Sequence, residues 1–412
     1  MADRHVEFVL VGGGVAAANC ARWLRKSGAD GEILLVGREP DPPYNRPPCS
    51  KGYLQGKESR SDTLVQKPEF YESQRIELLT RVSAMKLDTG ERTVTLSNRQ
   101  TVSFDRALLA TGAGVRRLNV PGSELEGIHY LRTLGNSDAI RADAAGKRVV
   151  LVGGSYIACE VAATLTELGS QCTLIMLESL PLSRGFGEQA GRFFAEVLAS
   201  HGVDVRGEQE LERFDGADGR VTKVITTSGL ELEADAVIIG AGAQPDVMLA
   251  RGAGLELGES GGVKVDSGLQ TSVPGIWAAG DIAEYDSVVH GRRLRIEHWD
   301  VAFNQGKAAA LNMLGQDQPY DVVPYFFSDL ADWAALEYVG PAARWDSEVV
   351  RGSLDEGAFT IFYLDGDRMV AALAVGRSED LQHARRLIAE RVDVSGSAGA
   401  LGDPSSDLST VG

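Results

Sequence analysis

Two stretches of the chain share one order of apolar and polar positions, "FVLVGGGVAAANCARWLRKSGADGEILLVGRE" at 8–39 and "VVLVGGSYIACEVAATLTELGSQCTLIMLE" at 149–178. In each, a β-branched apolar run meets glycines, continues with small and apolar residues at helical spacing, and closes with a second apolar run near an acid. This order predicts a strand, a glycine turn, a helix and a second strand. We therefore expect an α/β protein with two Rossmann-like βαβ units.

Three further apolar runs end in alanine and glycine: "DRALLATGAG" at 105–114, "ADAVIIGAGAQPD" at 234–246 and "TSVPGIWAAGDIAEY" at 271–285. Each predicts a strand whose small terminal residues let a flat cofactor or a second domain approach closely. Taken singly, each is also compatible with an ordinary exit from a strand into a loop. The third run carries a lone acid, Asp281, at its end.

The glycines of the first unit fit the dinucleotide fingerprint G-x-G-x-x-G/A at Gly12, Gly14 and Ala17. Gly12 serves the tight turn, Gly14 lets the backbone approach a pyrophosphate, and Ala17 allows close packing of helix on strand. The pyrophosphate would lie at the helix N-terminus, where N–H groups and the helix dipole favour an anion. One such motif is a common turn in α/β proteins, but two copies in complete βαβ units predict two nucleotide sites.

The second copy departs from the fingerprint, because its corresponding residues are Gly153, Ser155 and Ala158. Ser155 adds a side chain where close approach matters, or instead donates its hydroxyl to a phosphate. We therefore expect a second nucleotide site that works more loosely than the first.

The acids that follow the second strands bear on ribose recognition. In the first unit either Glu39 reaches the ribose hydroxyls or Arg38 lies over the adenine, and the sequence leaves both open. In the second unit Met176 stands where an acid is common, and Glu178 follows two positions later. Because a carboxylate would repel a 2′-phosphate, Glu178 favours NADH over NADPH.

Composition adds the broad class. A chain of 412 residues with 43% apolar residues is too long for one hydrophobic core and suits two or three globular domains. The N-terminus "MADRHVEFVLVGGG" leads from charges straight into glycines, with no run long enough for a signal sequence or a membrane span. This predicts a cytoplasmic protein.

Cysteine usage and charge exclude several kinds of site and partner. The four cysteines, Cys20, Cys49, Cys159 and Cys172, form no CxxC pair and have no histidine at metal spacing, which argues against disulfides, zinc and a protein-held iron–sulfur cluster. A redox centre would then be a bound organic cofactor. The net charge of −17 disfavours nucleic acid and anionic membranes as partners but leaves room for a local basic patch.

The loop "PPYNRPPCSKGYL" at 42–54 carries a cysteine and a lysine two positions apart behind a double proline. Pro47 and Pro48 stiffen the loop through their fixed φ angles. Cys49 would be either a redox thiol with a pKa lowered by the neighbouring lysine or a small apolar packing residue. Lys51 would be either a functional cation or a solvated loop charge.

The motifs, taken in order from about residue 6 to about 391, resemble the FAD-dependent ferredoxin and rubredoxin reductases of the pyridine nucleotide-disulphide oxidoreductase superfamily. The resemblance includes the loop at 42–54 and three further stretches, "YLRTLGNSDAI", "LRIEHWDVAFNQGKAAALNMLG" and "VPYFFSDLADWAALEYVG". It implies two dinucleotide-binding domains, as in glutathione reductase, and a C-terminal αβ domain. Apoptosis-inducing factor shares this architecture.

The resemblance implies specific domain bounds. The FAD-binding domain would span 1–113 and 244–320, interrupted by an NAD-binding domain at 114–243. The C-terminal αβ domain would span 321–392. The remaining residues, 393–412, are rich in Gly, Ser, Pro and Asp without apolar periodicity, which predicts a disordered tail.

The resemblance also assigns cofactor contacts residue by residue. For FAD it implies contacts with both glycine-rich turns of the FAD domain, the loop lysine, a backbone contact to the adenine, the acid for the ribityl chain, and aromatic residues near the flavin: Gly12, Gly14, Ala16, Ala17, Arg38, Glu39, Arg46, Lys51, Val82, Thr111, Gly112, Arg132, Gly280, Asp281, Glu297, His298, Trp299 and Phe327. For NAD it implies Gly153, Gly154, Ser155, Tyr156, Ile157, Glu160, Glu178 and Gly242. Tyr325, Phe326 and Phe327 match an aromatic run that covers the flavin.

Lys51 and Glu160 are the expected catalytic residues. The resemblance pairs them beside flavin N5, where a buried cation would stabilise the negative charge of the reduced flavin and the carboxylate would hold the lysine. From the residues alone, Glu160 is better explained as an acid near a helix N-terminus that interacts with the helix dipole.

The function implied is hydride transfer from NADH to FAD, followed by single-electron transfer to a 2Fe–2S ferredoxin of an oxygenase or P450 chain. An acidic ferredoxin needs a basic landing site, for which Arg292, Arg293, Arg295, Arg385, Arg386 and Arg391 are candidates. The alternatives are a thiol, peroxide or quinone reductase that uses Cys49 and a binding module that senses NADH, like apoptosis-inducing factor. A monomer or a dimer is expected.

Overall fold

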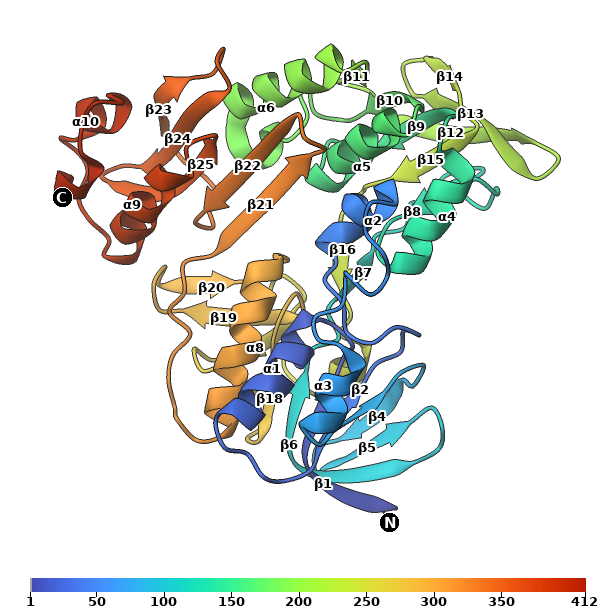
Figure 1. The fold of residues 1–412 in the computed structure, drawn as a ribbon, viewed down its shortest axis with the longest axis vertical. Helices are drawn as coiled ribbons and strands as arrows, with labels where there is room; N and C mark the ends of the chain where they lie inside the picture. The colour runs from blue at the N-terminus through green and yellow to red at the C-terminus, as the bar shows by residue number, and fades with distance from the viewer. Residues whose placement is uncertain (1) are drawn as a thin grey trace. The chain divides into compact units, whose positions relative to one another are not determined.

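The computed structural model describes residues 2–412, which fall into two compact units (Figure 1). Each unit is assembled from three separate pieces of the chain. Unit 1 comprises the residues up to Asn45, Ser61–Gly114 and Gln244–Tyr325, and unit 2 comprises Arg46–Arg60, Val115–Ala243 and Phe326–Gly412. The chain passes between the units near the short strands β7 (Ala113–Val115) and β16 (Ala243–Pro245).

Unit 1 is built on a seven-stranded sheet whose central strands are parallel, as the first repeat predicts. The order is β3-β2-β1-β6-β5-β4, and β18 also pairs with β6. The strands are β1 (Arg4–Val11), β2 (Ile33–Val36), β3 (Ile76–Leu79), β4 (Ala84–Asp88), β5 (Thr93–Leu96), β6 (Thr101–Leu109) and β18 (Ile276–Ala278). A smaller sheet joins β17 (Val263–Val265), β19 (Ala283–Ser287) and β20 (Arg292–Leu294).

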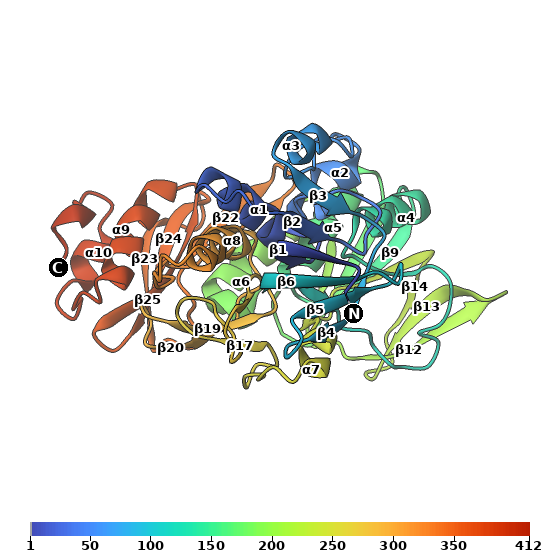
Figure 2. The same ribbon diagram turned by 90° about the horizontal axis from the view of Figure 1, so that it is seen from below.

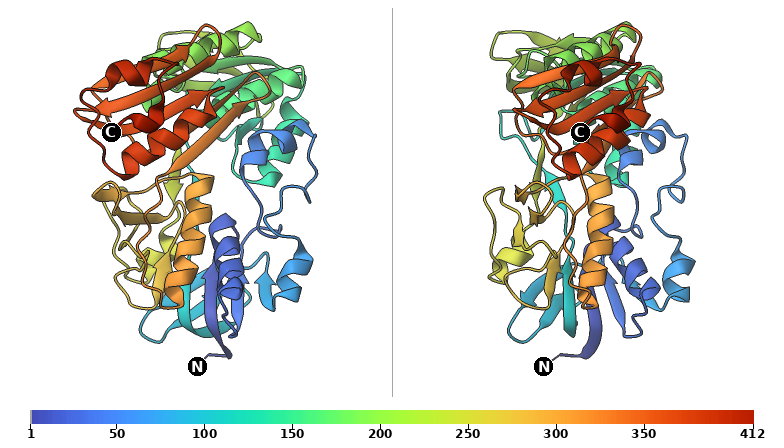
Figure 3. Two further views of the ribbon diagram at one scale, coloured as in Figure 1. Left: turned by 60° about the vertical axis from the view of Figure 1, so that its left-hand side comes forward. Right: turned by 90° about the vertical axis from the view of Figure 1, so that its left-hand side faces the viewer.

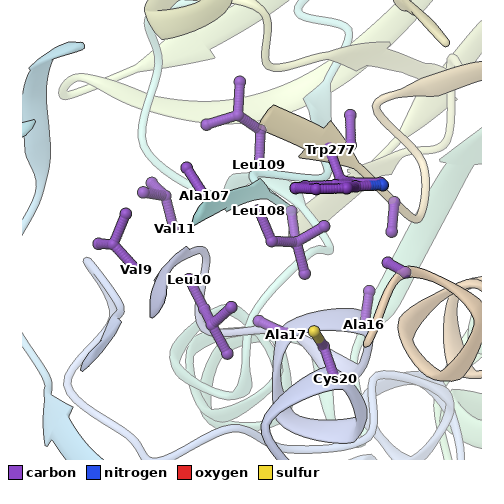
Figure 4. Packing of buried hydrophobic residues seen from close by; sticks show 14 of the residues in the cluster. Val9, Leu10, Val11, Ala16, Ala17, Cys20, Ala107, Leu108, Leu109 and Trp277 are labelled. Atoms are coloured by element: carbon purple, nitrogen blue, oxygen red, sulfur yellow. The ribbon is translucent and has the colours of Figure 1, made fainter. Parts of the chain in front are cut away.

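The core of unit 1 forms where these strands meet α1 (Val15–Lys26). Side chains of β1, β6 and α1 belong to one buried cluster that also includes Trp277 of β18 (Figure 4). Burying each such aliphatic side chain stabilises the fold by about 1.5–3 kcal/mol. The remaining helices of this unit are α3 (Pro68–Ser73), α7 (Met248–Gly252) and α8 (Trp299–Met313).

Helices α1 and α8 lie side by side, as Figures 1 and 2 both show. Their close approach depends on a missing side chain, because a Cβ at Gly306 would overlap the carbonyl oxygen of Ala16. Asn19 of α1 also donates from Nδ2 to the carbonyl of Phe303 in α8 at 2.6 Å. The last piece of unit 1 therefore packs directly on the helix that follows the first glycine turn.

Unit 2 contains the second predicted repeat within a five-stranded parallel sheet of order β11-β10-β9-β15-β8. An antiparallel sheet, β12-β13-β14, follows in the chain, and its β12–β13 hairpin projects at the right of Figure 2. The elements are β8 (Ile128–Tyr130), α4 (Leu134–Ala144), β9 (Arg148–Val152), α5 (Tyr156–Glu167), β10 (Gln171–Ile175), α6 (Ser183–Ser200), β11 (Asp204–Arg206), β12 (Leu211–Ala217), β13 (Arg220–Thr226), β14 (Glu231–Glu233) and β15 (Ala236–Ile239).

The C-terminal part of unit 2 is a second sheet of order β21-β22-β25-β24-β23, in which β21 is an edge strand. Helix α9 packs along β25 and β22 (Figure 3). The elements are β21 (Tyr325–Leu330), β22 (Ala334–Val339), β23 (Ser347–Ser353), β24 (Ala358–Asp365), β25 (Arg368–Val375) and α9 (Ser378–Ala389). The predicted fold class, two Rossmann-like sheets and a C-terminal αβ domain, is confirmed.

The prediction of a disordered tail at 393–412 is wrong. These residues form α10 (Ala398–Gly402) and η2 (Leu408–Thr410), and Leu401 and Leu408 are buried. The buried guanidinium of Arg351 donates to backbone carbonyls of the tail, among them that of Ser406 at 2.9 Å. The composition predicts that the backbone carbonyls of this segment bind water. In the structure Arg351 binds several of them instead, so the segment is ordered.

The loop residues Arg46–Arg60 group with unit 2 rather than with the expected FAD-binding domain. Leu54, in α2 (Gly52–Gln55), is fully buried in the core of unit 2, and the Tyr53 hydroxyl donates to Asp138 at 2.8 Å. Ser137 of α4 also donates to the carbonyl of Cys49 at 2.9 Å. Outside this loop the chain passes between the units at 114/115, 243/244 and 325/326, so the first two crossings lie within one residue of the predicted bounds and the third lies five residues beyond the bound predicted at 320.

All four cysteines are buried thiols without a disulfide. Within residues 2–412, no cluster of three or more His, Cys, Asp or Glu side chains could hold a metal ion. In the same part of the chain, none of the helices has the length and apolar character needed to cross a membrane.

Candidate functional site

The first glycine turn has the form that a bound pyrophosphate requires. Gly12 has φ 134°, and a Cβ there would overlap the carbonyl oxygen of Ala110. Gly14 is the N-cap of α1, and open space lies where its side chain would be. Ala16 and Ala17 are buried, and the first turn of α1 contains no acid. The N-terminus of α1 therefore presents N–H groups to open space, which fits an anion.

A second segment closes on this turn from the end of β18. Gly280 has φ 80° and lies close enough to Ala16 that a Cβ would contact it at 3.4 Å. The Gly280 N–H donates to Oε1 of Gln305 at 2.8 Å, while Nε2 of this buried glutamine has no hydrogen-bond acceptor within residues 2–412. An unmatched buried donor beside the turn fits a ligand that brings its own acceptors. Asp281 follows directly and accepts from Arg295 through its carbonyl at 3.2 Å.

The loops at the other strand ends of unit 1 hold most of the remaining FAD candidates. Arg38 is ion-paired with Asp246 at 2.7 Å, so its guanidinium already has a carboxylate partner. Glu39 accepts from the Tyr44 hydroxyl at 2.5 Å. The Thr111 hydroxyl donates to the Asp246 carbonyl at 2.7 Å. The Asp246 N–H in turn donates to Gly112 at 2.9 Å, and the Val82 N–H donates to Gly37 at 3.0 Å.

The start of α8 positions three more candidates. His298 is the N-cap, and burial lowers its pKa to about 4 against the opposing effect of the Asp281 carboxylate. Trp299 donates from Nε1 to Asn45 at 2.8 Å and stacks on Phe303. Glu297 is held by Arg295 at 2.5 Å. A neutral histidine and an oriented indole therefore lie together at one helix end.

The second glycine turn, in unit 2, also excludes side chains. Gly153 has φ 119°, and a Cβ there would contact the Gly240 carbonyl oxygen at 2.5 Å. Ser155 is the N-cap of α5: its oxygen accepts from the Ala158 N–H at 3.4 Å, and its hydroxyl donates to Gly240 at 3.3 Å. Of the two alternatives for Ser155, donation of its hydroxyl to a phosphate would therefore compete with a hydrogen bond inside the protein. The N-terminus of α5 still presents its backbone N–H groups.

The other nucleotide candidates of unit 2 surround this turn. A Cβ at Gly154 would contact Oε2 of Glu178 at 3.5 Å, so this carboxylate lies against the glycine turn. Tyr156 and Ile157 form the first turn of α5, and Gly242 with φ 96° accepts from the Arg116 N–H at 2.9 Å. A carboxylate at this place can accept from ribose hydroxyls and would repel a 2′-phosphate.

Lys51 and Glu160 form an ion pair within unit 2. Glu160, 3% exposed, lies in α5, and Lys51, 17% exposed, lies between η1 (Pro47–Ser50) and α2. Hydroxyls of Ser50 and Ser328 each donate to the Glu160 carboxylate at 2.5 Å. The pair expected from the sequence is therefore formed, and its carboxylate accepts from the Lys51 ammonium and from two serine hydroxyls.

Two loop residues and Cys49 complete this region. Arg46 donates to the carbonyl of Arg132 at 2.6 Å, which brings two of the FAD candidates together in unit 2. Thr133 begins α4 with a capping box that fixes the backbone next to Arg132. Cys49 is 3% exposed. A thiol that solvent hardly reaches cannot readily meet a disulfide or a peroxide, which weighs against the Cys49 alternative.

The aromatic run at the start of β21 divides between two faces. Phe326 packs against Tyr156 and Phe186 in the core of unit 2, with ring centroids 4.7 and 6.1 Å apart. Phe327 lies on the opposite face, and the Lys51 ammonium is 5.8 Å from its ring centroid. Because consecutive strand residues point to opposite faces, the run cannot act as one aromatic cover. The expectation that Phe326 covers the flavin with its neighbours is wrong.

Several of the candidate docking arginines are engaged within the protein. Arg293 pairs with Asp286 at 2.7 Å, and Arg386 donates to the carbonyl of Val411 at 2.6 Å. A different group stands out in unit 1: the ammonium groups of Lys26 and Lys307 lie 4.2 and 4.5 Å from the centre of the Trp23 ring. This basic aromatic patch is defined as Arg22, Trp23, Lys26 and Lys307.

Sequence reasoning missed four polar residues of the two sites. Ser50, Ser328, Asp329 and Gln305 were not singled out, although Ser50 and Ser328 adjoin residues that were. The signal available was alternation along β21, which places Ser328 opposite Phe327. This alternation does not identify the partner of Ser328, because Ser328 donates to the carboxylate of Glu160, 168 positions away in the chain.

Comparison with known proteins gives two family matches. Residues 6–306 match the model described as pyridine nucleotide-disulphide oxidoreductase, and residues 325–411 match the model described as reductase C-terminal. The two matches together take in both glycine turns and the C-terminal sheet, including most of the tail.

Three relatives align over nearly the whole chain. The anthranilate 1,2-dioxygenase system ferredoxin–NAD(+) reductase component of Burkholderia cepacia is 37% identical, covering 96% of this chain and 95% of its own. Rhodocoxin reductase of Rhodococcus erythropolis is 33% identical, covering 95% and 91%. The solved covalent putidaredoxin reductase–putidaredoxin complex contains a chain with a TM-score of 0.93 at 33% identity, covering 99% of this chain and 98% of that one.

Proposed function

Since the chain belongs to the pyridine nucleotide-disulphide oxidoreductase family, we propose that it is an FAD-dependent reductase that takes a hydride from NADH and delivers single electrons to a 2Fe–2S ferredoxin. The relatives that align over nearly their whole length are named as a ferredoxin–NAD(+) reductase component, as rhodocoxin reductase and as putidaredoxin reductase, which supports the same reaction here. The resemblance drawn from the sequence motifs is confirmed by these matches. We expect the protein to act in the cytoplasm.

The observation that carries the proposal is the buried Lys51–Glu160 pair. A cation that is held by a buried carboxylate and partly screened from water can stabilise negative charge that develops nearby, because charge interactions are stronger where water is excluded. Glu160 fixes the ammonium, and the two serine hydroxyls fix Glu160. Bound FAD would supply a ring that accepts two electrons and releases them one at a time.

The chain's own residues would bind the two cofactors at the two glycine turns. For FAD, the N-terminus of α1 would bind the pyrophosphate, with Gly280 and Asp281 closing on it and Gln305 offering its unmatched amide. For the nicotinamide nucleotide, the N-terminus of α5 would serve in the same way. Glu178 against Gly154 favours NADH, since its carboxylate would repel the extra phosphate of NADPH.

The basic aromatic patch is the best candidate surface for the ferredoxin. Helix α1 contains no acid, and α8 contains one, Asp300 in its first turn. No ion pair involves Arg22, Lys26 or Lys307 within the described residues 2–412. In a chain with a net charge of −17, uncompensated cations on neighbouring helices form a local positive field that an acidic protein would recognise.

The proposal is tested by NADH-dependent turnover of the purified holoenzyme against a panel of acceptors. We expect fast reduction of a 2Fe–2S ferredoxin and slow reduction of disulfides, peroxide and quinone, with NADH preferred over NADPH. Turnover of a disulfide faster than that of every ferredoxin tested would replace this function with the thiol alternative. Very slow reduction of the flavin by NADH, with no acceptor turned over, would favour the binding module.

A further inference from the structure

The Lys51 ammonium faces a second carboxylate that the ion pair with Glu160 does not require. Asp329 Oδ2 lies 3.6 Å from Lys51 Nζ, and both residues belong to unit 2. The side chain of Asp329 is 36% exposed, against 3% for Glu160. It has no other ion-pair partner within residues 2–412. One cation therefore lies between a buried and a half-exposed anion.

The buried carboxylate is already matched without Asp329. Glu160 receives the Lys51 ammonium and the hydroxyls of Ser50 and Ser328, so both of its oxygens have donors. The lysine and glutamate charges cancel as a pair. The charge of Asp329 is then in excess, and the group of three carries a net charge of −1.

The edge strand β21 contributes to this arrangement of Lys51, Glu160 and Asp329 through both of its faces. Phe327 and Asp329 lie on one face of the strand, toward the Lys51 ammonium. Phe326 and Ser328 lie on the other face, toward α5. Because one face of the strand contacts Lys51 and the other contacts Glu160, the strand fixes Asp329 relative to Lys51. The placement of Asp329 is therefore a property of the strand register and not of a mobile loop.

We propose that Asp329 is a positioning residue that lowers the reduction potential at the flavin site by offsetting the charge of Lys51. This proposal rests on the proposed function, because it takes Lys51 as the cation beside the cofactor. Reduction adds negative charge to the cofactor. With Asp329 the site has a net charge of −1, whereas the Lys51–Glu160 pair alone is neutral, so the site with Asp329 stabilises the reduced state less. A lower potential favours the onward transfer of electrons to an iron–sulfur protein of low potential.

The test is the midpoint potential of the bound flavin in Asp329→Asn, measured by anaerobic titration against reference dyes. The ratio of reduced to oxidised flavin at a fixed potential is expected to rise about tenfold, which is about 30 mV for a two-electron couple. Asp332→Asn removes an equal charge from the exposed turn after β21 and should leave the potential unchanged. Asp329→Glu keeps the charge and should return the potential close to that of the wild type.

Salt gives a second readout that a merely structural role would not move. Because Asp329 is partly exposed, its effect should be screened, so the wild-type potential should rise between about 20 mM and 500 mM salt. The potential of Asp329→Asn should change less over the same range. Equal potentials for Asp329→Asn and wild type, or a shift shared by Asp332→Asn, would overturn the proposal.

The potential is measured without any acceptor protein, so the two proposals fail separately. If the wild type reduces no ferredoxin while the Asp329→Asn potential rises, the acceptor assignment is wrong and the role of Asp329 stands. If ferredoxin is reduced and the potential does not move, Asp329 has no tuning role. FAD content and circular dichroism spectra of the variants confirm that each potential belongs to a folded holoprotein.

Discussion

At the scale of single residues, Glu160 illustrates how a buried charge is accommodated. Its carboxylate is almost inaccessible to water, yet a lysine and two serines donate to it. Leaving a buried polar group without its partner costs about 1–3 kcal/mol, more when the group is charged. Removing Lys51 therefore has two effects, a loss of charge at the site and a loss of stability in unit 2, and an experiment must separate them.

Lys51→Met should slow reduction of bound flavin by NADH about 100-fold, because the stabilising cation is lost. Stopped-flow absorbance at the flavin band measures this rate, and the FAD content should stay close to that of the wild type. The double variant Lys51→Met/Glu160→Gln is the matched control, since it removes the unpaired charge as well. The variant should regain stability but not rate; recovery of the rate would show that Lys51 acts only through folding.

The second residue-scale prediction concerns His298 and acid stability. Its pKa is about 4 in the folded protein because of burial, against about 6.5 for an unperturbed histidine. Between these two values the unfolded chain binds the proton and the folded protein does not, so stability falls as the pH drops from about 6.5 toward 4. At pH 5 this contribution amounts to about 2 kcal/mol relative to pH 7.5.

Urea unfolding at pH 7.5 and pH 5 measures this contribution. His298→Gln removes the titrating group, so its loss of stability between the two pH values should be about 2 kcal/mol smaller than that of the wild type. The exposed His201 is the control position, and His201→Gln should follow the wild type. An identical pH dependence in all three proteins would contradict the assignment.

Cys49 gives the third residue-scale prediction. Its side chain is buried, and its backbone is held at both ends, since its carbonyl accepts from Ser137 and its N–H donates to the carbonyl of Arg46. Cys49→Ala should therefore lower stability by about 1 kcal/mol and leave steady-state turnover of every acceptor within about twofold. A loss of turnover confined to disulfide or peroxide acceptors would restore the thiol mechanism.

At the scale of elements, the C-terminal segment depends on one arginine. Arg351 pairs with Asp380 at 3.2 Å and donates to carbonyls of the tail, including Pro404 at 3.2 Å and Ser406 at 2.9 Å. Both members of the pair are about 95% buried. A single buried guanidinium thus joins β23, α9 and the last residues of the chain.

Arg351→Met should release this segment, because breaking a buried pair costs about 3–5 kcal/mol. Limited proteolysis followed by mass spectrometry should show new cleavage between residues 393 and 412. Arg344→Met removes an exposed arginine of the same domain, whose pairing with Asp365 is loose at 3.4 Å, and should leave the cleavage pattern unchanged. Equal resistance of both variants would show that Arg351 does not hold the tail.

The elements also explain what the sequence could and could not predict. Both βαβ units and their glycine turns are predictable, because strand, turn and helix each follow from neighbouring residues. The ordered tail and the Ser328–Glu160 bond are not, because each depends on a partner far away in the chain. Strand alternation predicts that Phe326 and Phe327 point to opposite faces, whereas the family resemblance implies that they cover the flavin together.

At the scale of the whole molecule, the charge distribution matters more than the total. A chain with 58 acidic and 41 basic residues repels an acidic partner on average. The basic aromatic patch reverses this locally, because the half-buried Trp23 ring holds the ammonium groups of Lys26 and Lys307 close together. Productive encounter with a ferredoxin should then depend on a few cations.

Ferredoxin reduction should therefore decline steeply with ionic strength, while ferricyanide reduction should not. Lys26→Gln/Lys307→Gln should raise the KM for ferredoxin about tenfold at low salt, with ferricyanide turnover unchanged. Lys86→Gln/Lys264→Gln is the matched control, since these exposed lysines of unit 1 are paired with Asp88 and Glu256. Parallel salt curves for the two acceptors, or equal effects of both double variants, would count against the patch.

The contact of α8 with α1 has a consequence for the order in which the protein is made. Gly12 leaves the ribosome before the second repeat, whereas β18, Gly280 and Gln305, which complete the walls around it, follow only after that whole repeat. At about 5–20 residues per second, the nascent first turn waits on the order of ten seconds or longer for these partners. We expect the first glycine turn to acquire its ligand only late in synthesis, so that truncated chains ending before α8 are released without it.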